Sequence, residues 1–255
     1  MIYLILGGVS AFLGLASGLG PTTLLRPLLD AVSSLPAESV SLLCSVATLS
    51  SVLVIAFFAL SEPLSVHPDE LILLAIGSAL GGILGDLASS RFFTDISRDT
   101  AALLSNALLF VLLALPAVYF HTLSRTVRPL SITRIASLPV AFFIGLFASF
   151  LSFGAEPLTL MMYFLLFDAE HREASTAALT IALCAMCGKL VCALIRTRLN
   201  LPHAGILLWL LPGAVIGAFL SAFPAISGKS SSKGELLIRM SLFTSLLNMA
   251  SAFAG

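Results

Sequence analysis

Two short stretches of this sequence combine glycine, proline and hydroxyl residues in a way that interrupts a helix and can bind an anion. The first break, residues 20–23, reads Gly-Pro-Thr-Thr, and the second break, residues 154–159, reads Gly-Ala-Glu-Pro-Leu-Thr. Proline suits the first position of a new helix, and a helix that begins there presents free N–H groups and a partial positive charge. Two such ends facing each other predict a site for a small anionic solute, formed by Gly20, Pro21, Thr22, Thr23, Gly154, Ala155, Glu156, Pro157 and Thr159.

Three charged residues, Glu156, Lys189 and Arg26, lie in apolar sequence and are candidate coupling or charge partners. A carboxylate at membrane depth is costly and by default functional, so Glu156 can take up and release a proton during transport; the alternative is a plain N-cap. Lys189 either pairs with Glu156, holds a substrate anion, or reaches toward the membrane interface. Arg26 faces either the cavity or the lipid headgroups. Asp86, close to Arg91 near an expected helix end, is predicted to be interfacial.

The composition places these residues in a membrane protein. Of the 255 residues, 58% are hydrophobic and only 10% are charged, and the mean hydropathy is +1.08. A soluble domain carries about 25% charged residues, because its surface must face water. The 13 basic and 13 acidic residues cancel, which argues against a nucleic-acid partner. We therefore expect an all-α, multi-pass integral protein of the cell membrane with no water-soluble catalytic module.

The gaps between charge clusters predict about eight transmembrane helices, since about 20 apolar residues cross the hydrocarbon core. The expected spans are residues 2–18, 39–60, 70–90, 100–121, 134–152, 173–195, 203–224 and 236–254. Two further apolar pieces, 21–35 and 156–167, are too short to cross alone. If they complete full crossings with the preceding helices, the two halves of the chain are parallel. If they turn back as re-entrant hairpins, the halves are inverted. The basic residues of the loops leave the membrane orientation open.

The chain reads as two related halves. We predict a first repeat over residues 1–124, a central polar loop over 125–133 and a second repeat over 134–255, with four hydrophobic segments in each repeat. Each half holds a broken helix, expected near the membrane midplane, and later a Gly-rich helix, at 77–85 or 212–217. Paired interruptions of this kind are the best sequence pointer to a transporter binding site. The Gly-x-x-x-Gly spacings in the Gly-rich helices predict close helix packing instead.

Metal and cofactor chemistry have little support in the sequence. Cys184 and Cys187 have C-x-x-C spacing, but no second pair and no neighbouring histidine accompany them, so we expect no metal site. No cofactor is predicted, and no phosphate-binding loop signature occurs, so the energy for transport must come from gradients or from a partner. The sequence leaves homo-oligomerisation open.

The two breaks resemble the paired signature of the sulfite exporter TauE/SafE family, small membrane carriers whose halves each open with a Gly-rich stretch ending in proline. Residues 18–27 match the length and end residues of the first copy, and 154–159 resemble the second, often G-G-G-P-L-T. Of the expected glycine triplets only Gly20 and Gly154 remain, and Glu156 stands in the signature. The resemblance implies eight helices and transport of sulfite, sulfonates or related anions. A carboxylate at a helix N-terminus could occupy the place of the substrate anion.

Two functions follow from these observations. The first is a secondary transporter of a small anion (sulfite, a sulfonate, or another sulfur-containing or organic anion) that is proton-coupled and works by alternating access about the two breaks. The alternative is an intramembrane enzyme, such as a polyprenyl-pyrophosphate phosphatase-like hydrolase. Such an enzyme needs arginine, serine, histidine or glutamate clustered at depth, and here only Glu156 and Arg26 qualify. The sequence therefore favours the transporter.

Overall fold

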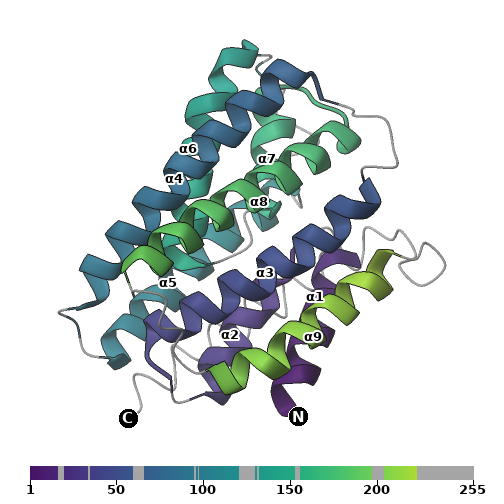
Figure 1. Ribbon diagram of the computed structural model, residues 1–255. Coiled ribbons are helices and arrows are strands. Elements are labelled where there is room, and N and C mark those ends of the chain that lie inside the picture. The colour runs from purple at the N-terminus through teal and green to yellow at the C-terminus, as the bar shows by residue number, and fades with distance from the viewer. Residues whose placement is uncertain are drawn as a thin grey trace.

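The computed structural model describes residues 1–16, 20–33, 35–59, 66–94, 96, 98–120, 130, 132–152, 156–196 and 204–222. Within these ranges the protein is all-helical, which confirms the predicted class (Figure 1). In chain order the elements are α1 (Ile2–Ala16), α2 (Thr22–Val32), α3 (Ala37–Ala59), α4 (Pro68–Thr94), α5 (Arg98–Val118), the short 3₁₀ helix η2 (Arg134–Ala136), α6 (Ser137–Leu151), α7 (Glu156–Leu166), α8 (His171–Arg196) and α9 (Ala204–Ala222).

Long apolar helices make this an integral membrane protein. Five segments are long and apolar enough to cross a bilayer: Glu38–Phe58, Pro68–Phe92, Arg134–Leu151, Arg172–Arg196 and Gly205–Ala222. Large apolar side chains also cover the outside of the molecule. Phe57, for example, is 74% exposed and Leu208 is 70% exposed. An outer surface of this kind is stable in lipid rather than water. The count of eight spans stays a prediction, and the expected span 236–254 lies outside the described residues.

Glycines bring neighbouring helices into backbone contact, as in the pairs α4–α6 and α1–α9. A Cβ added at Gly81 of α4 would lie 2.2 Å from the carbonyl oxygen of Phe142 in α6, and the glycines one turn before and after Gly81 meet α6 in the same way. A Cβ added at Gly217 of α9 would lie 2.2 Å from the carbonyl oxygen of Gly8 in α1. The predicted packing role of the Gly-x-x-x-Gly spacings is therefore confirmed.

Alanine at Gly81 is expected to lower thermal stability in detergent, because a backbone carbonyl occupies the place of the new methyl group. Overpacking of this kind costs about 1–3 kcal/mol. Gly205 in α9 is the matched control, since a Cβ there meets nothing within 4 Å. Gly205→Ala should leave the unfolding temperature unchanged or raise it slightly. Equal unfolding temperatures for the two variants would contradict the packing interpretation.

The short helices α2 and α7 turn back beside the helices that precede them. In the first hairpin, the Gly20 N–H donates to the Gly14 carbonyl over 3.1 Å, and Ala11 of α1 joins a buried cluster with Leu25 and Leu29 of α2. In the second hairpin, the chain just before α6 runs beside the end of α7. There the N–H groups of residues 130 and 132 donate to the carbonyls of residues 165 and 166 over 2.9 and 2.8 Å. Each short helix thus forms a helical hairpin with the helix before it, and the re-entrant architecture with inverted halves stays a prediction.

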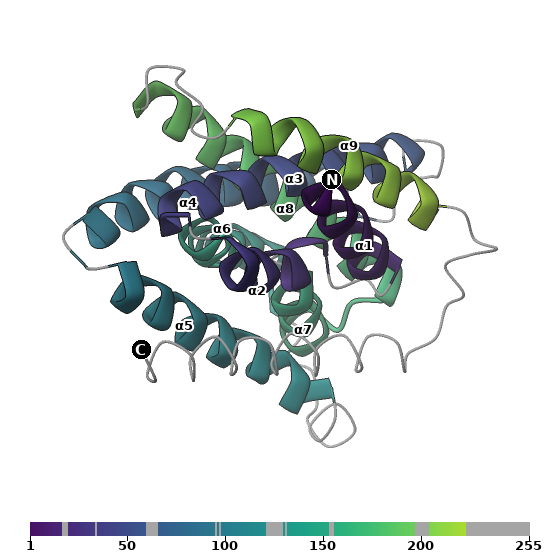
Figure 2. The same ribbon diagram turned by 90° about the horizontal axis from the view of Figure 1, so that it is seen from below.

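The two hairpins open at opposite ends of the bundle. The α1–α2 hairpin leads into the start of α3, where Glu38 lies 2.8 Å from Arg196 at the end of α8. The α6–α7 hairpin leads into the start of α8, which is 26 residues and thus about 39 Å long. Figure 2 shows α2 and α7 near the middle of the bundle, with α3, α8 and α9 on one side and α5 on the other. The long helices therefore surround the two short ones.

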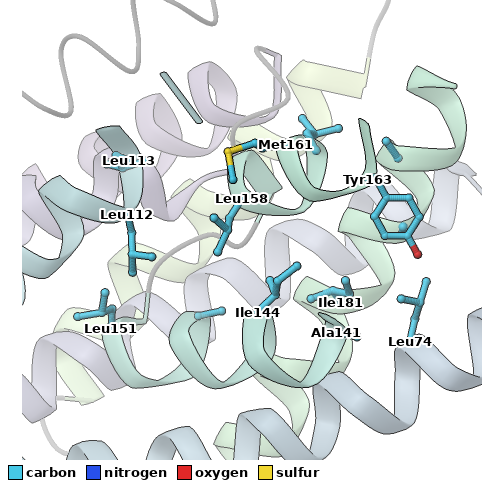
Figure 3. Close-up of a cluster of buried hydrophobic side chains, with 14 of the residues drawn as sticks. Leu74, Leu112, Leu113, Ala141, Ile144, Leu151, Leu158, Met161, Tyr163 and Ile181 are labelled. Atoms are coloured by element: carbon cyan, nitrogen blue, oxygen red, sulfur yellow. The ribbon is translucent and has the colours of Figure 1, made fainter. Parts of the chain in front are cut away.

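A continuous apolar cluster holds α7 in this central position. Leu158 and Met161 of α7 pack with Leu113 of α5, Ile144 of α6 and other buried side chains (Figure 3). Burying each such side chain contributes about 1.5–3 kcal/mol in water, whereas in lipid the gain comes mainly from close packing. The start of α7, where Glu156 lies, is consequently fixed by neighbours on several helices.

Candidate anion-binding site

The two breaks meet at their tips, where Glu156 lies against Gly20. Gly20 has a φ of 78°, which favours glycine. A Cβ added there would lie 2.1 Å from Oε2 of Glu156 and 2.3 Å from its Cδ. The carboxyl group thus occupies the space that any larger residue would need at position 20. Two residues later α2 begins, and Glu156 itself begins α7. One carboxylate therefore lies beside the tips of both hairpins.

Three buried polar atoms of the two short helices have no hydrogen-bond partner in the described part of the chain: Thr22 Oγ1, Arg26 Nη1 and Glu156 Oε2. Their residues are 0%, 2% and 8% exposed, respectively. The Nε atom of Arg26 lies 3.8 Å from the Asp30 carboxylate one turn on, which leaves the guanidinium fork only partly used. A buried polar group without a partner costs about 1–3 kcal/mol. Such groups are typical of a site that receives a polar solute.

Both helix ends add donors to the junction. The first turn of a helix has N–H groups without partners inside that helix. In α2 these N–H groups belong to the turn that follows Pro21. Thr23 of α2 and Thr159 of α7 are fully buried in the first turns of the two short helices. In α7 the first turn begins with Glu156 and Pro157, so proline removes one donor there. The arrangement can therefore stabilise negative charge, and the Glu156 carboxylate is the negative charge already present.

Lys189 of α8 is fully buried and donates three hydrogen bonds within the protein. Its Nζ donates to the Ser149 carbonyl over 2.5 Å and to the Ser41 hydroxyl over 2.7 Å, and it also donates to the Ser152 hydroxyl. Ser152 ends α6 in a left-handed conformation with φ 51°. An ammonium has three N–H donors, and each has an acceptor here. Lys189 therefore binds the end of α6, and the interfacial alternative is wrong.

A cluster of three charged side chains joins α3, α4 and α8 at one end of the bundle. Arg196 at the end of α8 lies 2.8 Å from Glu38 of α3 and 3.5 Å from Asp86 of α4. Asp86 is only 2% exposed, so it is buried in the protein, and its predicted position at the membrane interface stays a prediction. Arg196, 110 positions later in the sequence, supplies the counter-charge that a buried carboxylate needs.

The sequence-predicted site residues divide into three groups. Gly20, Thr22 and Glu156 lie at or beside the junction, and Arg26 lies one turn farther along α2. Pro21, Thr23, Pro157 and Thr159 are in the buried first turns of the same short helices. Lys189 belongs to the network around Ser41 and Ser152. Gly154 and Ala155 lie outside the described residues.

Sequence reasoning missed two serines, Ser41 and Ser152, whose hydroxyl oxygens lie 2.5 Å apart and both accept from Lys189. Ser41 is in a hydroxyl-rich start of α3, and Ser152 directly precedes the second break. Because a buried lysine needs several acceptors, the available signal was the serine-rich start of α3 and the serine before the second break, read together with Lys189.

Comparison with known proteins gives one match. The family model described as Sulfite exporter TauE/SafE matches residues 3–250, which is nearly the whole chain. No curated protein and no solved structure matches this chain.

Proposed function

This chain belongs to the sulfite exporter TauE/SafE family, and from that premise we propose that it moves a small anion through the junction of the two hairpin tips. Membership makes the protein a membrane transporter of anions and excludes the hydrolase alternative. The proposal adds the site: the first turns of α2 and α7, with Thr22, Arg26 and Glu156 around the solute. The observation that supports this proposal is the close approach of the Glu156 carboxyl group to Gly20.

Glu156 gives the proposed site a proton-dependent mechanism. A carboxylate and a substrate anion compete for the same helix ends and the same arginine, since like charges at close range repel. Protonation of Glu156 removes that repulsion, so the anion enters together with a proton. Release of both on the other side of the membrane completes a proton-coupled cycle. The substrate class is a compact oxyanion such as sulfite, a sulfonate or another small organic anion, which can accept hydrogen bonds from Thr22, Arg26 and backbone N–H groups at once.

Alternating access follows from the two hairpins in this proposal. Each hairpin opens at a different end of the bundle, and their tips share one solute. Movement of one hairpin against the long helices then exposes the junction to one side, as in transporters built around discontinuous helices. The Arg196 group with Glu38 and Asp86 ties α8 to α3 and α4 at one of those ends. We propose that this ion-pair group opens when the site faces that side.

Flux into proteoliposomes tests the proposed function. We expect sulfite, sulfonate, thiosulfate or carboxylate flux through the native protein to rise as the pH falls on the substrate side. Glu156→Gln keeps the shape of the side chain but carries no titrating group, so its flux should lose the pH dependence while the variant remains folded. Asp69→Asn, at an exposed acid in the first turn of α4, is the control and should behave as the native protein does. An unchanged pH profile in Glu156→Gln would reject the proton role.

A further inference from the structure

A polar cavity lies away from the junction, at the end of the bundle where α4 and α8 begin. It has a volume of about 190 Å³ and is lined by Glu70, Tyr163, Glu173, Arg134 and His67, with Ile132 among its apolar residues. Tyr163 lies seven residues beyond Glu156 on α7, which places it about 10 Å farther along that helix. The cavity is therefore separate from the proposed anion site.

Two carboxylates from different helices converge on one phenol inside this cavity. The Tyr163 hydroxyl donates to Oε1 of Glu70 over 2.9 Å, and Figure 3 shows the ring extending toward the α4 side, near Leu74. Glu173 of α8 is also close enough to interact electrostatically with Tyr163. Glu70 is only 9% exposed, and within the described ranges no ion pair joins it to a basic residue. A neutral phenol donor compensates only part of the desolvation of a buried carboxylate, which favours a cation beside it.

Arg134 gives the same cavity a positive side. Backbone hydrogen bonds from residues 130 and 132 to the end of α7 hold the chain here, and η2 begins shortly afterwards with Arg134. Apolar side chains next to it face outward, since Leu130 is 63% exposed and Ile135 is 77% exposed. One cavity thus presents carboxylates, a guanidinium and an adjoining apolar surface, in a protein whose outside faces lipid.

We propose that this cavity binds the phosphoethanolamine headgroup of a membrane lipid. The primary ammonium donates hydrogen bonds to Glu70 and Glu173, the phosphate accepts from Arg134, and the acyl chains lie over Ile132, Ile135 and Leu130. An ammonium with N–H donors satisfies both carboxylates, whereas a trimethylammonium has no such donors. These charged hydrogen bonds should make the cavity prefer phosphoethanolamine over phosphocholine, since lipids with these two headgroups are otherwise alike.

Lipid retention measured by native mass spectrometry tests this proposal. The full chain is reconstituted in vesicles of phosphatidylethanolamine and phosphatidylglycerol, or of phosphatidylcholine and phosphatidylglycerol, and the lipids that remain bound after extraction are counted. We expect phosphatidylethanolamine to be retained about tenfold more than phosphatidylcholine, and Glu70→Gln to remove most of that preference. The Gln side chain can still accept from Tyr163, so the fold should survive. Asp69→Asn, at the exposed neighbouring acid, should keep the preference.

Further arms distinguish the lipid from its free headgroup. Soluble phosphoethanolamine should compete weakly, because it lacks the acyl contacts with Ile132 and Ile135. Arg134→Gln should weaken retention of phosphatidylethanolamine while leaving transport of the anion in place. Equal retention of the two zwitterionic lipids, an unchanged preference in Glu70→Gln, or displacement by free phosphoethanolamine at concentrations comparable to the lipid's would each overturn the proposal.

Discussion

Replacing Gly20 with alanine is expected to reduce anion flux by about tenfold or more, because the new methyl group lies where the Glu156 carboxyl is now. The carboxyl is the far end of a flexible side chain and can move aside. The bundle therefore survives, and the unfolding free energy falls by only the left-handed backbone strain of about 1–2 kcal/mol. What is lost is the placement of the carboxylate between the two helix ends. Transport should thus fall far more than stability does.

A double-variant experiment isolates that contact. In a Glu156→Gly background there is no carboxyl for the alanine methyl to displace, so Gly20→Ala should add only the backbone strain. The two changes should then be strongly non-additive in flux, as expected for residues in direct contact. Gly205→Ala serves as the neutral control for an added methyl group. Additive losses, or a Gly20→Ala variant that transports like Gly205→Ala, would show that the hairpin tips do not form the site.

The positions of the two breaks could be predicted to within a few residues, because they follow from local backbone chemistry. Proline at positions 21 and 157 cannot donate a hydrogen bond in a helix interior, and glycine at position 20 permits a positive φ. The same reasoning placed Glu156 at the start of a short helix, where it lies. That the two tips touch depends on how α3 to α9 pack, which no local pattern contains.

The partners of the charged residues could not be predicted, since they come from distant parts of the chain. Lys189 binds Ser41, 148 positions earlier, and Asp86 meets Arg196, 110 positions later. A charge in apolar sequence signals that a partner must exist inside the protein, but hydropathy alone does not say where. The contacts of α4 with α6 and of α9 with α1 are also long-range, and no local pattern in the sequence contains them. The division of the chain at residues 125–133 stays a prediction.

Lys189→Met is the second change expected to have a large effect, and it separates function from folding. The side chains are similar in length, and removing a buried charge relieves its desolvation, so the variant should remain folded. The Ser149 carbonyl and the two serine hydroxyls, however, lose their common donor. Ser41 and Ser152 can still bond each other, but the hydrogen bonds from α8 to the left-handed end of α6 are lost. The second break, which begins at that end, loses its support.

Flux should consequently fall by about ten- to a hundredfold in Lys189→Met, the range expected for losing charge-assisted hydrogen bonds that set geometry. Ser152→Ala removes one of the three acceptors and should have a smaller effect of the same kind. Lys189→Arg should not rescue transport, because a planar guanidinium is too large and too rigid to direct three converging bonds into this space.

The decisive comparison is flux against unfolding temperature in the same detergent. A Lys189→Met variant that unfolds at the native temperature and transports at the native rate would mean that the network does not position the break. If Lys189→Met lost flux only because it unfolds, Ser152→Ala should lose stability and flux in the same proportion. The positioning role predicts instead that flux falls more than stability does, so a proportional loss would contradict it.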